Sequence, residues 1–119
     1  MQYLLLIYEA EEIWENKTDA EKTEVMAGHE RLSQQLVADG VTFDGQPLMA
    51  TSTAVSVRQR AGETQITDGP FAETKEQLGG FYIVDVPGME DALRYAAMIP
   101  TTGTIEVRPV ADHSEHLPA

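Results

Sequence analysis

The chain has 119 residues, of which 42% are hydrophobic and 24% are charged, a balance typical of one globular domain. It contains no cysteine, which excludes disulfide scaffolds, thiolate metal centres and cysteine nucleophiles. Twenty acidic side chains against eight Lys and Arg give a net charge of −12, so direct binding to nucleic acid is not expected. No apolar run approaches the ~20 residues of a membrane span, and no basic residue precedes the apolar start as in a signal sequence. We therefore expect a cytoplasmic protein without membrane contact.

The first predicted strand covers Tyr3–Tyr8, where both faces are apolar apart from tyrosine hydroxyls. An antiparallel strand that faced water on one side would alternate instead. This strand should therefore be central in its sheet and covered on both sides. The acidic stretch Glu9–Glu15 that follows is expected to be irregular.

The first long helix is predicted from Thr18, because Thr18 and Glu21 have the spacing of a capping box. It should run to Ala38 or Asp39 and end at Gly40, which takes a left-handed cap without strain. Its apolar stripe consists of Val25, Leu32 and Leu36, broadened by Met26 and Val37. His29 falls on this stripe and should face the sheet.

A hairpin is predicted in the middle of the chain. Residues 43–50 carry turn signals and are expected to form a loop. The strand Ala54–Arg60 alternates cleanly, and Ala61-Gly62 is a plausible two-residue turn. With that turn, Val57 opposes Ile66.

The remaining elements follow from turn and cap residues together with the apolar pattern. They are a turn at Asp68–Phe71, a helical turn or two over Ala72–Leu78 ended by Gly79-Gly80, a second strand with two apolar faces at Phe81–Val86, a helix at Met89–Ile99 ended by Pro100, and an edge strand at Thr104–Val110. Residues 1–110 form one predicted domain, and 111–119 form a C-terminal tail.

The predicted order is β-α-β-β-(turn)-β-α-β. With the extra hairpin strand set aside, this is the split βαβ pattern of an α+β, ferredoxin-like sheet. In that topology the first and third main strands are central, and these are the two strands with two apolar faces. Two helices cover only one face of such a sheet, so we expect a second subunit to cover the other and form a homodimer.

The segment Asp68–Asp85, DGPFAETKEQLGGFYIVD, resembles the signature of the DGPF branch of the YCII-related proteins. The opening QYLLLIYE and the closing IEVRPV are also similar to that family. The resemblance implies a dimeric α+β barrel built from two ferredoxin-like subunits. Some relatives in the wider group resemble lyases or isomerases that lack cofactors and carry a histidine in the first helix, which His29 matches. The DGPF group also occurs beside, or fused to, extracytoplasmic-function sigma factors, which implies an accessory role.

Two residues are candidates for catalysis. His29 titrates near neutrality and can both take and give a proton. It could equally be a core histidine whose ring is satisfied by a backbone carbonyl or a carboxylate. Asp68 could orient His29, although an aspartate in this position more often fixes its own turn. We expect His29 and Asp68 to lie near Tyr8 in one cleft.

Three residues are candidates for substrate binding. Tyr8 and Tyr82 lie on sheet faces and could line a pocket, although a dimer interface would explain them as well. Lys75 could hold an anion, although an exposed lysine is commoner. We expect no metal and no cofactor: His113 and His116, with their acidic neighbours, lie in the tail.

Two function classes follow from these patterns. The first is a cofactor-free lyase or isomerase that binds a small molecule and uses His29 as acid or base. The second is a non-catalytic accessory or sensing module that contacts a sigma factor, for which the acidic surface is suited.

Overall fold

The computed structural model describes residues 1–112, so the predicted tail lies, from residue 113 on, outside the described residues. The elements are β1 (Gln2–Glu9), α1 (Glu11–Glu15), α2 (Asp19–Ala38), β2 (Thr42–Pro47), a 3-10 turn (Thr51–Thr53), β3 (Val55–Arg60), β4 (Glu63–Asp68), β5 (Gln77–Asp85), α3 (Met89–Ala96) and β6 (Thr104–Pro109).

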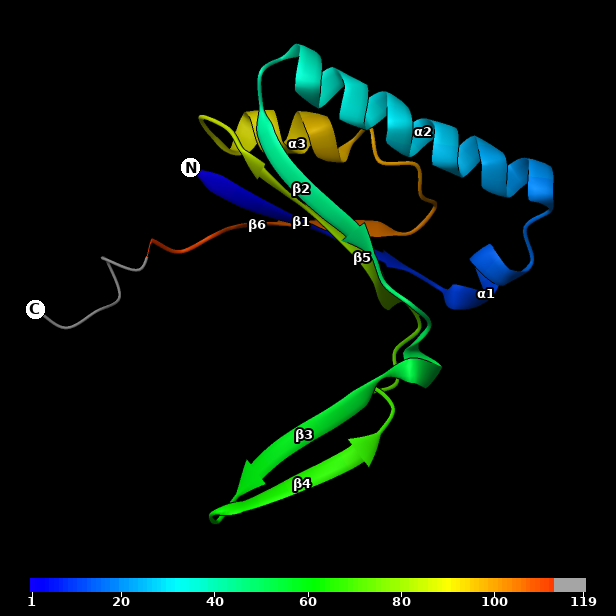
Figure 1. The fold of residues 1–119 in the computed structure, drawn as a ribbon, viewed down its shortest axis with the longest axis vertical. Coiled ribbons are helices and arrows are strands. Elements are labelled where there is room, and N and C mark those ends of the chain that lie inside the picture. The colour runs from blue at the N-terminus through cyan, green and yellow to red at the C-terminus, as the bar shows by residue number, and fades with distance from the viewer. Residues whose placement is uncertain (113–119) are drawn as a thin grey trace, which may run out of the picture.

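The main sheet is antiparallel with the strand order β2-β5-β1-β6, while β3 and β4 form a separate two-stranded sheet (Figure 1). β1 and β5 are central, which confirms the prediction made from their two apolar faces. The α+β arrangement is compatible with the ferredoxin-like type. No helix within residues 1–112 has both the length and the apolar character needed to cross a membrane.

Helix α2 begins and ends as predicted. The Thr18 hydroxyl accepts a hydrogen bond from the Glu21 amide at 3.1 Å, and the Glu21 carboxylate accepts one from the Thr18 amide at 3.0 Å. These bonds satisfy two amides that the first turn cannot pair internally and lower the pKa of Glu21. Gly40 adopts a φ of 72° just past the helix end, a conformation that glycine reaches without strain.

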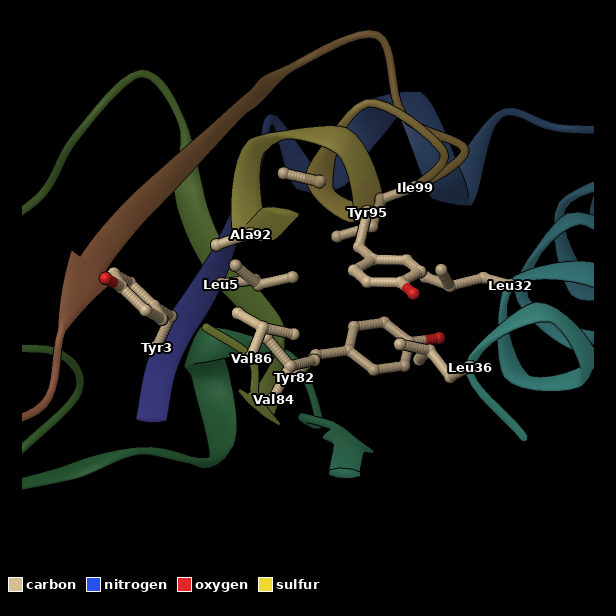
Figure 2. Packing of buried hydrophobic residues seen from close by; sticks show 11 residues of the cluster. Tyr3, Leu5, Leu32, Leu36, Tyr82, Val84, Val86, Ala92, Tyr95 and Ile99 are labelled. Carbon is tan, nitrogen blue, oxygen red and sulfur yellow. The ribbon is translucent and has the colours of Figure 1, made fainter. Parts of the chain in front are cut away.

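The hydrophobic core lies between the helices and one face of the main sheet. Leu5 of β1 and Val84 of β5 are fully buried, and so are Leu32 and Leu36 of α2. Figure 2 shows Tyr82 of the sheet among these side chains, together with Ala92, Tyr95 and Ile99 from α3 and the residues after it. The core holds α2 and α3 on this face.

The other face of the main sheet is covered by no helix among the described residues. Leu4 and Leu6 alternate with the buried residues of β1 and pair with Ile83 and Phe81 of β5. All four side chains are partly exposed. Polar residues of the edge strands flank them: Asp44, Gln46, Glu106 and Arg108. We call the four apolar residues the open apolar face.

The second main strand was predicted in the wrong place. Residues 42–47, expected to belong to a loop, form the edge strand β2, whereas Val55–Arg60 pairs only within the hairpin sheet. Asp44-Gly45 and Pro47 are typical turn residues, which is why the sequence predicts a loop there. In the structure Pro47 ends the strand at the sheet edge, where a missing amide costs little, and Gly45 lies opposite Tyr82, whose ring fills the space of a side chain.

Two further expectations need correction, and one is confirmed. The acidic stretch contains the short helix α1, and residues 72–78 form no helix, because Gly79 and Gly80 continue β5 instead of ending a helix. The Gln77 side chain instead accepts a hydrogen bond from the Glu11 amide at 3.0 Å and donates one to the Thr74 carbonyl. The hairpin register is as predicted, with Val57 opposite Ile66.

Candidate functional site

The site centres on two side chains from different layers of the fold. His29 projects from α2 and Tyr82 from the central strand β5, and Nδ1 of His29 lies 2.7 Å from the Tyr82 hydroxyl. The two rings are stacked with centroids 5.8 Å apart. Either the phenol donates to Nδ1 or Nδ1–H donates to the phenol oxygen, depending on the tautomer. Both residues were predicted as site residues, but their pairing was not.

Three small or rigid residues fix this geometry. A Cβ at Gly28, the neighbour of His29, would lie 2.9 Å from Cγ of Pro100, so α2 can approach the loop after α3 only with glycine there. A Cβ at Gly45 would lie 2.8 Å from Cδ1 of Tyr82 and 2.8 Å from the Phe81 carbonyl oxygen. Any larger residue at 45 would therefore displace the Tyr82 ring.

Burial sets the protonation states of the pair. His29 is about half-buried, and desolvation lowers its pKa below the ordinary value. Tyr82 is only 8% exposed, and desolvation raises the pKa of its phenol. Both groups are therefore neutral at pH 7, which leaves His29 able to accept a proton and Tyr82 able to donate a hydrogen bond.

The other three predicted site residues lie elsewhere. Tyr8 shares the sheet face of Leu4 and Leu6, opposite the face that carries Tyr82. Asp68 is exposed at the end of β4, in the hairpin sheet, where it pairs with Val55. Of the five residues, the structure thus brings together His29 and Tyr82, and the roles of the others stay predictions.

Lys75 borders a groove at one end of the main sheet. This groove has a volume of about 840 Å³ and lies between α1, the 3-10 turn and the segment that follows Asp68. Glu11 organises it, because its carboxylate accepts hydrogen bonds from the Thr51 amide at 2.6 Å and from the Thr51 hydroxyl at 3.1 Å. Gly69 and Pro70 line the same groove as Lys75, whereas His29 does not.

A second pair of polar groups joins α2 to α3 and was missed by the sequence analysis. The buried Tyr95 hydroxyl donates to the Asp39 carboxylate at 2.5 Å, and this bond together with burial raises the pKa of the phenol. Arg94 lies over the Tyr95 ring and pairs with Asp91 at 3.1 Å. The signal was present in the sequence, since Tyr95 lies on the apolar stripe of α3 and its hydroxyl needs a partner.

The fold and this site define a small α+β protein with a half-buried histidine and no disulfide. Comparison with known families then places it: the YCII-related domain matches residues 1–114, and the chain belongs to this family. An uncharacterised protein of Rhizobium meliloti (strain 1021) is 38% identical over 115 residues, which cover 93% of each chain.

Proposed function

We propose that the protein binds a small cyclic or carbonyl compound beside His29 and acts on this compound by proton transfer, as a cofactor-free lyase or isomerase. The observation that carries this proposal is the 2.7 Å contact between Nδ1 of His29 and the Tyr82 hydroxyl. A histidine that starts the reaction as a general base must be neutral, oriented and partly accessible, and His29 meets these three requirements.

The roles within the pair follow from the geometry. Tyr82 holds the imidazole through Nδ1. In the tautomer in which Nδ1–H donates to the phenol oxygen, Nε2 has a free lone pair and is the atom that takes a proton from the substrate and returns it. The phenol is a positioning group, because its raised pKa keeps it protonated at pH 7. In this proposal Tyr82 takes the place of Asp68, the residue that the sequence analysis considered for orienting His29.

The same proposal includes a homodimer in which two copies pack open apolar face against open apolar face to form an α+β barrel. Leu4, Leu6, Phe81 and Ile83 are partly exposed in one subunit and would be buried in the pair. The helices α2 and α3, with His29, would then lie on the outside of the barrel.

The test is a ligand screen by thermal unfolding and by NMR, with catechol and cyclohexane-1,3-dione as probes of ionisable ring hydroxyls and enolisable carbonyls. We expect at least one probe class to raise the Tm and to perturb the signals of His29 and Tyr82. The His29→Ala variant should lose the response, whereas Lys75→Ala, in the separate groove, should keep it. A response that depends on Lys75 and not on His29 would refute the proposed site.

An accessory role is the second candidate, and the net charge of −12 is the observation that favours it. Such a surface attracts the basic surface of a DNA-binding partner such as a sigma factor. Salt-sensitive co-purification with a sigma factor encoded nearby, unaffected by His29→Ala, would favour this role over catalysis.

A further inference from the structure

One face of the β3–β4 hairpin carries all of its large apolar side chains, and we call it the apolar face; the other face is entirely polar. Paired residues of an antiparallel ladder share a face, so Val57 and Ile66 lie together, and Val55 joins them two residues along. The polar residues of this face lie at its two ends: Asp68 opposite Val55, and Gln59 opposite Thr64. Val57 is 60% exposed and Ile66 is 70% exposed. The opposite face carries only polar side chains: Ser56, Arg58, Arg60, Glu63, Gln65 and Thr67. A hairpin that was only a solvated loop would not need its apolar side chains gathered on one face.

The hairpin lacks support from its own subunit. Within residues 1–112, β3 and β4 pack extensively only against each other. An isolated two-stranded hairpin is marginally stable in water, so its apolar face needs a surface to pack against. In the view of Figure 1, α2 and α3 lie above the main sheet and the hairpin lies below it, on the side that neither helix covers.

Exposed apolar side chains are also present in the two segments that connect the hairpin to the main sheet. Met49 lies between β2 and β3 and is 79% exposed, and Phe71 lies between β4 and β5 and is 80% exposed. The adjoining strand β5 carries Phe81 and Ile83 of the open apolar face. Exposed apolar side chains thus occur on the main sheet, in the segments that connect it to the hairpin, and on the hairpin itself.

We propose that the hairpin is an arm that packs through Val57 and Ile66 onto a second copy of this chain. This inference rests on the homodimer of the proposed function, to which it adds a second contact region. Charge supports a second copy as the occupant. The hairpin contains Arg58, Arg60, Glu63 and Asp68, so its net charge is zero in a chain of net charge −12. The hairpin can therefore approach another acidic copy with little repulsion.

The test compares two lysine substitutions at adjacent positions on opposite hairpin faces. Ile66→Lys places a charge on the apolar face, and Gln65→Lys places the same charge on the polar face. Sedimentation equilibrium should show a dimer Kd raised at least about tenfold by Ile66→Lys and changed less than about threefold by Gln65→Lys. In the wild type, hydrogen exchange of the hairpin amides should slow when the protein concentration rises above the dimer Kd.

The results of these measurements distinguish the arm contact from the dimer itself. Equal dimer Kd values for the two variants, together with hairpin amides that exchange fast at every concentration, would refute the arm contact. The proposed dimer would be unaffected by that result. A wild type that stays monomeric at every concentration would overturn both. The hydrogen-exchange measurement needs no substitution, so a variant that fails to fold does not decide the result.

Discussion

The Leu6→Glu variant is expected to be a folded monomer, with a dimer Kd raised at least about 10³-fold. Leu6 lies on the open apolar face, on a central strand and opposite Phe81, so it would be near the middle of the interface. A twofold dimer would bury two carboxylates, and each buried unpaired ion costs several kcal/mol. A rise of 10³-fold corresponds to about 4 kcal/mol, which is well within that cost.

The matched control is Leu93→Glu, which makes the same chemical change on α3, where the leucine side chain is 51% exposed. α3 covers the opposite face of the sheet, so this variant should dimerise like the wild type. Light scattering and sedimentation measure both. Far-UV circular dichroism should show that Leu6→Glu keeps its helices, and a dimer of unchanged Kd would place the interface elsewhere.

The His29→Ala variant should lose turnover by ~10²–10⁴-fold on any substrate that the screen identifies, because a general acid or base contributes about that much. It should stay dimeric, since His29 is a polar residue on an aliphatic stripe and contributes little apolar packing. Free imidazole should restore part of the lost rate, because it can occupy the space that the ring leaves and supply the missing nitrogen.

A purely structural His29 gives a different pattern. With either role, removal of the ring leaves the buried Tyr82 hydroxyl without a partner, at a cost of about 1–3 kcal/mol in unfolding free energy. With a purely structural role, turnover of the folded variant would change little, and imidazole would have no effect on the rate. The double variant His29→Ala with Tyr82→Phe would recover the lost stability, because no polar group is then left unpaired.

Much of the fold could be predicted because local signals and burial agreed. β1 and β5 are apolar on both faces, and only central strands need that. The capping box at Thr18 and the glycine at 40 fixed both ends of α2. β2 escaped prediction because its Gly45 and Pro47 signal turns locally, whereas the Tyr82 ring and the sheet edge determine their roles.

The site could be predicted only in part. The stripe of α2 places His29 toward the sheet, and alternation along β5 places Tyr82 on one face. Their contact depends on how α2 crosses β5, which is a long-range packing result that no local pattern contains. Alternation along β1 places Tyr8 on the face of Leu4 and Leu6, and the pairing of β1 with β6 agrees with this. Which of the two faces α2 covers is not contained in that alternation, so Tyr8 could not be separated from His29. Asp68 belongs to a hairpin whose direction the turn residues do not determine.

The central claim, a neutral His29 held by Tyr82, is tested most directly by an NMR titration of the His29 ring. Its signals can be assigned from a His29→Gln variant, and Tyr82→Phe removes the hydroxyl alone. We predict a His29 pKa below the ordinary value of about 6.5, and an Nδ1 chemical shift that changes in Tyr82→Phe. A His29 pKa at or above 6.5, with an Nδ1 shift that is the same with and without the Tyr82 hydroxyl, would contradict the account.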